Sequence, residues 1–214
     1  MMRTKNTFVE EEGILEISAD KVKRLRDQTG AGMMDCKIAL KEAGGDIEEA
    51  ATILRKKGIA SASKKAGRTA SEGVITSYIH PGSKIGVLVE VNCETDFVAR
   101  TKEFQDFSHE IAVQIAAMNP QYRSREDIPG DVMNREREIL LDQLATSGKP
   151  ENVKKQIVEG RLEKWYTESV FMDQPFVKDD SQKMHEFINN HIAKFGENIV
   201  IRRYVRFKLG EAVD

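Results

Sequence analysis

Two β-rich runs separated by a short turn constrain the fold of this chain more than any other feature. Residues 74–80 and 85–91 are rich in β-branched residues, and residues 81–83 (Pro-Gly-Ser) lie between them. Because Pro, Gly and Ser favour turns, the pattern predicts an antiparallel β-hairpin. Near the end of the chain, apolar residues alternate with polar ones and predict one more strand: Ile199, Ile201, Val205, Phe207 and Leu209.

Helical periodicity follows the hairpin. Between residues 101 and 118 the apolar positions recur at helical spacing: Phe104, Phe107, Ile111, Ile115 and Met118. One amphipathic helix beside three short strands is typical of the α+β class. The sequence therefore predicts an α+β core domain over residues 73–214, built on a small antiparallel sheet.

A long insertion, about residues 119–170, separates the elements of this core. It contains two stretches of helical pattern, whose apolar positions are Val132, Ile139, Leu140 and Leu144 in the first and Val153, Ile157, Val158, Leu162 and Trp165 in the second. Residues 147–150 (Ser-Gly-Lys-Pro) interrupt the pattern, which predicts an antiparallel helical hairpin. The pattern leaves open whether this hairpin projects from the core or packs flat against the sheet.

Residues 17–58 have the pattern of three short helices. Ser18 is a candidate N-cap for the first, and Gly30 a candidate end. The second begins near Gly32 and carries the apolar residues Met34, Ile38 and Ala39. Asp46 can cap the third, which we expect to end before Gly58. So small a bundle is marginally stable alone, which favours a recognition module over a catalytic scaffold.

Two further segments flank this bundle. Residues 59–72 are rich in Ala, Ser, Lys and Gly and predict a partly helical linker. With the cations just upstream they form a local basic segment: Arg55, Lys56, Lys57, Lys64, Lys65 and Arg68. Residues 1–16 lack an apolar stretch of signal-peptide length and predict a weakly ordered extension.

The junction between the hairpin and the following helix is the strongest candidate for a functional site. Residues 92–100 (Asn-Cys-Glu-Thr-Asp-Phe-Val-Ala-Arg) place the bulky Phe97 where a turn is normally polar. Thr95 or Asp96 can cap the next helix and so fix the direction of the neighbouring side chain. Two interpretations of Phe97 follow from spacing: it seals the end of its own core, or it projects into a crevice on a partner.

Composition and motifs disfavour several other functions. The 214 residues carry a formal net charge of −2, which argues against general nucleic-acid binding, and no apolar run approaches the length of a membrane span. Only two cysteines occur, Cys36 and Cys93, and we expect both to be reduced structural thiols. No phosphate-binding loop, zinc spacing or catalytic triad signature is evident. We therefore expect no cofactor, no metal and no bond-making catalysis.

Two long motifs resemble the elongation factor Ts family. They are residues 25–37 (Leu-Arg-Asp-Gln-Thr-Gly-Ala-Gly-Met-Met-Asp-Cys-Lys) and residues 91–100. Shorter matches follow at residues 147–150, 158–161, 174–176 and 196–199, so the resemblance covers nearly everything from residue 17 to residue 211. Proteins of this family exchange guanine nucleotide on elongation factor Tu. The resemblance implies a UBA-like N-terminal bundle and a coiled-coil hairpin protruding from the core.

The resemblance also implies roles for particular residues. The family stretch implicated in dislodging Mg²⁺ from elongation factor Tu matches Thr95, Asp96, Phe97 and Val98, with Phe97 as the wedge and Asp96 as its support. Met33 and Met34 are candidate partner contacts because Met suits an adaptable surface. As adjacent helical positions they point about 100 degrees apart, so one can be core while the other faces outward. Lys23 and Arg26 are candidate rim contacts or simply solvated cations.

Oligomeric state and location are expected from the same resemblance. Some family members carry two copies of the α/β subdomain, and this chain has room for one. We therefore expect a homodimer that binds two molecules of elongation factor Tu, with a monomer left open. The cytoplasm is the expected location, and a plastid stroma or mitochondrial matrix is the alternative.

Two rival functions remain at this stage. A ribosome- or RNA-associated adaptor without exchange activity could use the basic segment and the hairpin, although no aromatic residue interleaves those charges. An enzyme with a dispersed site is supported only by the general presence of acids and histidines. Neither explains a projecting Phe97 together with a separate recognition bundle.

Overall fold

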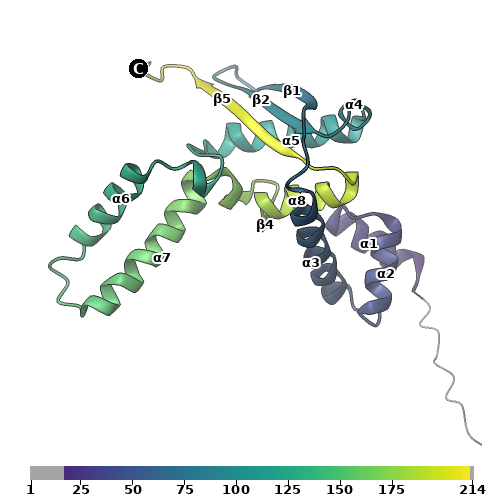
Figure 1. The fold of residues 1–214 in the computed structure, drawn as a ribbon, viewed down its shortest axis with the longest axis horizontal. Coiled ribbons are helices and arrows are strands. Elements are labelled where there is room, and N and C mark those ends of the chain that lie inside the picture. Colours follow the sequence, from purple (N-terminus) through teal and green to yellow (C-terminus); the bar gives the residue numbers. More distant parts are fainter. Residues whose placement is uncertain (1–16, 213–214) are drawn as a thin grey trace, which may run out of the picture. The chain divides into compact units, whose positions relative to one another are not determined.

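The structure is a computed structural model that describes residues 17–212 (Figure 1). The expected N-terminal extension, residues 1–16, lies outside the described residues. The chain divides into two compact units, residues 1–57 and residues 58–214. Within the described residues no helix has the length and apolar character needed to cross a membrane.

The first unit holds helices α1 (Ala19–Thr29), α2 (Met33–Glu42) and the start of α3 (Ile47–Lys65). The hydroxyl of Ser18 accepts a hydrogen bond from the Lys21 backbone N–H, and Gly30 ends α1 in the left-handed conformation, so both predicted boundaries are confirmed. The buried side chains of the three helices meet in one small cluster: Val22, Leu25, Cys36, Ala39, Leu40, Ala43, Ala50 and Leu54.

The expected end of α3 is wrong, because the helix continues past Gly58 to Lys65. Gly58 is buried, and a Cβ added there would lie 3.1 Å from the Asn190 side-chain oxygen. This glycine therefore allows close packing inside the second unit instead of stopping the helix. A glycine inside a helix costs about 1 kcal/mol relative to alanine, which the packing must offset.

The second unit is built on a three-stranded antiparallel sheet in the order β1-β2-β5, as the α+β class predicts. Its strands are β1 (Glu72–Ile79), β2 (Ile85–Cys93) and β5 (Val200–Lys208). The predicted turn carries positive φ at Gly82 and Ser83, and pairing continues along the whole hairpin from Glu72↔Cys93 to Ile79↔Gly86.

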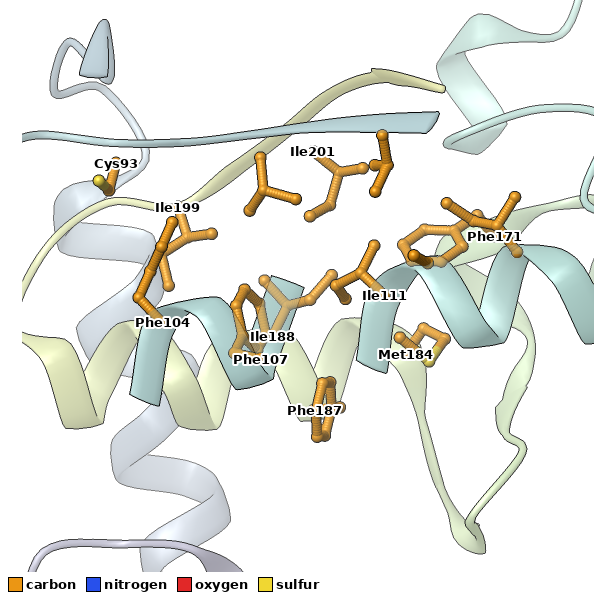
Figure 2. Packing of buried hydrophobic residues seen from close by; sticks show 14 of the residues in the cluster. Cys93, Phe104, Phe107, Ile111, Phe171, Met184, Phe187, Ile188, Ile199 and Ile201 are labelled. Atoms are coloured by element: carbon orange, nitrogen blue, oxygen red, sulfur yellow. The ribbon is translucent and has the colours of Figure 1, made fainter. Parts of the chain in front are cut away.

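One face of the sheet is covered by α5 (Lys102–Met118) and by side chains of α8 (Met184–Phe195). Figure 2 shows Phe104, Phe107 and Ile111 of α5 and Ile188 of α8 in the same layer as Ile199 and Ile201. Alternate residues of β2 point into this layer, with Val87, Val89, Val91 and Cys93 all buried.

The apolar residues of the last strand do not share one face. Glu90 pairs with Arg203 and Val91 with Ile201, so Arg202 is an extra residue in β5. An extra residue reverses the side of the sheet that every later side chain occupies. Ile201 is buried in the core, whereas Val205, Phe207 and Leu209 are exposed on the opposite side.

The insertion folds into α6 (Gly130–Asp142) and α7 (Glu151–Ser169), which form the predicted antiparallel pair. Their contact has its own cluster of buried residues, separate from the sheet cluster: Leu140, Leu144, Val158 and Leu162. A hairpin packed flat on the sheet would have merged the two clusters, so that alternative is wrong. Short elements complete the unit: α4 (Asp96–Ala99), η1 (Arg125–Asp127), η2 (Phe171–Asp173), β3 (Pro175–Phe176) and β4 (Asp179–Lys183).

Candidate functional site

The junction between β2 and α4 holds Phe97 out into solvent. Phe97 is 83% exposed, although the next two residues turn inward: Val98 packs against the sheet cluster and Ala99 is buried. A one-turn helix anchored on one side and bare on the other presents its outer side chain in a fixed direction. The interpretation in which Phe97 seals its own core is therefore wrong.

Thr95 is the N-cap of α4, which resolves the choice between Thr95 and Asp96. Its φ and ψ are −129° and 151°, and its hydroxyl oxygen accepts a hydrogen bond from the Val98 backbone N–H at 3.4 Å. Asp96 occupies the first helical position, where a carboxylate interacts favourably with the helix N-terminus. Its side chain also pairs with the Arg100 guanidinium at 2.9 Å, and both groups are exposed enough for this pair to contribute little stability.

Cys93 ends β2 directly behind this loop. Its thiol donates a hydrogen bond to the Thr95 carbonyl oxygen at 3.2 Å. Burial, assisted by the nearby Glu197 carboxylate, raises the pKa of the Cys93 thiol to about 11. The thiol is therefore neutral at physiological pH and acts as part of the packing, as expected for a reduced structural cysteine; Cys36 is likewise free and buried.

One group that supports this loop was missed by sequence reasoning. Glu197, in the short segment between α8 and β5, accepts hydrogen bonds from the backbone N–H groups of Glu94 and Thr95 at 3.0 and 3.1 Å. It also accepts a hydrogen bond from the Thr95 hydroxyl at 2.6 Å. The only signal in the sequence was its place in the matching segment 196–199, because its partners lie about a hundred residues away.

The candidate contacts of the first unit lie at the start of α2 and on α1. Met33 and Met34 are 55% and 67% exposed, so neither is buried in the core, although their positions allowed this for one of them. Ile38, one turn further along α2, is also exposed and extends the apolar surface. Lys23 and Arg26 are three residues apart on α1, and both are exposed. The helices of this unit thus display apolar side chains with cations available near them in sequence.

The basic segment is partly neutralised by neighbouring groups. The Lys57 ammonium pairs with Glu42 at 2.8 Å, and the Arg68 guanidinium pairs with Glu94 at 3.5 Å. The Lys65 ammonium donates a hydrogen bond to the Ser61 hydroxyl. These contacts give no support to an RNA-binding surface here. Across residues 17–212, no three His, Cys, Asp or Glu side chains are grouped as a metal site requires.

Known proteins are similar in sequence to this chain along almost its whole length. A family model described as "Elongation factor TS" matches residues 11–211. A protein named elongation factor Ts from Thermoanaerobacter sp. (strain X514) is 59% identical over 198 residues, covering 92% of this chain and 97% of that protein. Its namesake from Caldanaerobacter subterraneus subsp. tengcongensis is also 59% identical, with 92% and 99% covered. The protein of that name from Anaeromyxobacter sp. (strain Fw109-5) is 55% identical over 199 residues, with 93% and 91% covered. Because the family model and these relatives all span nearly the full length, the chain belongs to the elongation factor Ts family.

Proposed function

We propose that this chain, a translation elongation factor with a role in nucleotide exchange, binds the GDP-bound state of elongation factor Tu and expels GDP with Phe97. The observation that carries this mechanism is the 83% exposure of Phe97 on an anchored one-turn helix. In the proposed complex Phe97 enters a crevice beside the partner's Mg²⁺ site, and Asp96 and Val98 hold the helix behind it. The partner then loses Mg²⁺ and phosphate contacts and releases GDP.

The energetics set the size of the effect. Burying a Phe side chain contributes about 1.5–3 kcal/mol, and about 1.4 kcal/mol corresponds to a tenfold change in affinity. Only contacts made preferentially with the nucleotide-free partner weaken GDP binding. By reciprocity, the chain lowers the affinity for GDP by the same factor by which GDP lowers the affinity for the chain. Insertion of Phe97 alone can therefore weaken GDP binding by about 10- to 100-fold.

Stopped-flow fluorescence of labelled GDP leaving elongation factor Tu tests this mechanism. Phe97→Ala should slow the stimulated release about 10- to 100-fold at saturating chain, because it removes the buried ring from the complex. Val177→Ala is the control: Val177 is another exposed apolar residue of the second unit, and it should leave the rate unchanged. A Phe97→Ala variant as fast as the unmodified chain would remove the wedge from the mechanism.

The first unit supplies affinity in this proposal. Met33, Met34 and Ile38 form the apolar part of the docking surface, with Lys23 and Arg26 as charged rim contacts. Met33→Ala combined with Met34→Ala should weaken association while the maximal rate of GDP release stays the same. Calorimetric titration of elongation factor Tu measures the affinity, and an unchanged dissociation constant would exclude both residues from the contact.

The outer face of the sheet supports the expected homodimer. Its exposed apolar side chains lie on all three strands and directly after β5: Ile75, Ile79, Leu88, Val205, Phe207 and Leu209. Leu88 pairs directly with Val205, and the charges beside them on this face, Glu90 and Arg203, neutralise each other in an ion pair at 2.7 Å. Large exposed apolar patches mark interaction sites, and a second copy of this face would bury it by sheet-on-sheet packing. Light scattering of the purified chain should give a dimer, and Phe207→Glu should give a monomer; a monomer in both cases would refute this arrangement.

Chemistry and location follow from the same proposal. The chain forms and breaks no bond; hydrolysis of GTP belongs to the partner. Its relatives are bacterial proteins, so we propose the cytoplasm, where translation takes place in bacteria, as its location.

A further inference from the structure

The loop that carries Phe97 is tied to the segment that precedes β5 by two carboxylates. Glu197 accepts three hydrogen bonds from Glu94 and Thr95, two of them from backbone N–H groups. In the opposite direction, the Glu94 carboxylate accepts a hydrogen bond from the Asn198 backbone N–H at 2.6 Å. Each loop thus offers a side-chain acceptor to the backbone of the other.

A third segment closes this arrangement. The Asn198 side-chain amide donates a hydrogen bond to the Arg68 carbonyl oxygen at 2.8 Å, and Asn198 is buried. The Arg68 guanidinium lies 3.5 Å from the Glu94 carboxylate. The Glu94 carboxylate is only 22% exposed, so its hydrogen bond to Asn198 is partly shielded from water. Hydrogen bonds to charged groups are the strong class, and shielding strengthens them.

The bond from the Thr95 hydroxyl to Glu197 has a particular consequence for α4. A hydroxyl has one proton to donate, and here that proton points at the Glu197 carboxylate. The oxygen therefore turns its lone pairs towards the Val98 backbone N–H, which is the capping bond of α4. Glu197 thus fixes the N-cap as well as the two amides before it.

A helix as short as α4 depends on such external bonds. It has four residues, fewer than the number at which a helix becomes stable by itself. Its inner side is anchored by Val98 and Ala99, but its N-terminal end is held by Thr95. Without Glu197 the three donors before α4 lose their acceptor, and the direction of Phe97 is no longer fixed from that end.

We propose that Glu197 is a positioning residue for nucleotide exchange, which acts through Thr95 to hold Phe97 in the orientation that enters the partner. This inference rests on the proposed role of Phe97. Glu197 does not contact the nucleotide in this scheme; it reduces the number of orientations of Phe97 that must be given up on binding.

Two variants and one control test the proposal. Glu197→Ala removes all three acceptor contacts, and Glu197→Gln keeps the size of the side chain with one carbonyl oxygen as acceptor. Glu103→Ala is the control, since Glu103 is an exposed acid of α5 in a long ion pair with Lys194, at 3.6 Å. Amide hydrogen exchange of the free chain is the first measurement. The amides of Glu94 and Thr95 should exchange about tenfold faster in Glu197→Ala, as expected when a charge-assisted hydrogen bond is lost, while buried β2 amides stay protected.

Stimulated GDP release is the second measurement. Glu197→Ala should lower the maximal rate about tenfold and leave the half-saturating concentration of chain unchanged, with Glu197→Gln in between. A general loss of folding would change both quantities and the β2 amides. In a double-mutant cycle, Glu197→Ala should have no further effect once Phe97→Ala is present, because it acts through that ring.

The outcomes separate the two proposals. If Phe97→Ala releases GDP at the unmodified rate, the proposed function fails before Glu197 is considered. If Phe97→Ala is slow but Glu197→Ala is as fast as the control, or if the two effects multiply independently, the positioning role of Glu197 is refuted and the wedge remains.

Discussion

Arg125 joins the base of the helical hairpin to the rest of the second unit, and its removal should be costly. The guanidinium makes two hydrogen bonds to Asp173, at 2.6 and 3.0 Å, and two to Glu163 of α7, at 2.8 and 2.9 Å. It also lies over the Tyr166 ring, 4.1 Å from the centroid. The pKa of Glu163 is lowered because Arg125 donates to its carboxylate.

The expected magnitude follows from burial. Arg125→Ala leaves the Asp173 carboxylate without its cation, and this side chain is only 13% exposed. Loss of one partner from a buried ion pair costs about 3–5 kcal/mol. Arg125 and Glu163 are 38% and 59% exposed, and water screens that half of the network. We therefore expect a destabilisation of about 2–3 kcal/mol for Arg125→Ala.

Urea unfolding followed by tryptophan fluorescence measures this loss. Trp165 is the single tryptophan of the chain and lies on α7, beside Tyr166. Arg137→Ala is the control, because Arg137 also links α6 to α7 but pairs with Glu159 at 3.4 Å with both side chains exposed. That control should lose less than about 0.5 kcal/mol.

A second substitution examines the cause. If the unpaired carboxylate is responsible, Asp173→Asn in the Arg125→Ala background should recover part of the lost stability. An Arg125→Ala variant within the range of Arg137→Ala would refute the reasoning. So would a double variant that is less stable than Arg125→Ala alone.

Two further predictions concern the core of the second unit. Burial lowers the pKa of His191 from 6.5 to about 4, so below pH 6.5 the unfolded chain binds a proton that the folded chain does not. The free energy of unfolding should therefore be full above pH 6.5 and fall by about 2 kcal/mol by pH 5. If the urea midpoint depends on pH in the same way in His191→Phe, the prediction is wrong. Gly73 has φ of 145°, and an added Cβ would collide with the Val91 carbonyl oxygen. Gly73→Ala should therefore lose about 2 kcal/mol or more of stability, whereas Gly160→Ala in the open middle of α7 should gain about 0.5–1 kcal/mol. Changes in melting temperature of the same sign for both variants would contradict this.

The sequence pattern was sufficient to predict those features that depend on residues close together in the chain. The turn at residues 81–83, the caps at Ser18 and Gly30 and the helical hairpin all follow from short-range preferences, and each is found as predicted. Helical spacing was less informative for Met33. It lies three residues before the buried Cys36, which suggests burial, yet it is exposed because burial also depends on what packs over the first turn of α2.

Features set by contacts between distant segments could not be predicted. Gly58 has the appearance of a helix end, and the close approach of Asn190, which accounts for a glycine inside the helix, is not visible in the sequence. Glu197 resembles any solvated acid in a loop, since its three donors come from Glu94 and Thr95, about a hundred residues away in the sequence. The exposure of Phe97 was one of two interpretations open from spacing, and the family resemblance favoured it.

The single extra residue Arg202 determines which side chains of β5 face solvent. Beyond it, Tyr204 and Arg206 turn inward and donate hydrogen bonds to the Pro120 and Ala116 carbonyl oxygens, while Val205 and Phe207 turn outward. If Arg202 were instead paired with Glu90 in regular register, these two pairs would exchange sides, with Phe207 under the sheet and the Arg206 guanidinium in solvent. The bulge at Arg202 thus determines that the outer face of β5 displays apolar side chains beyond this point.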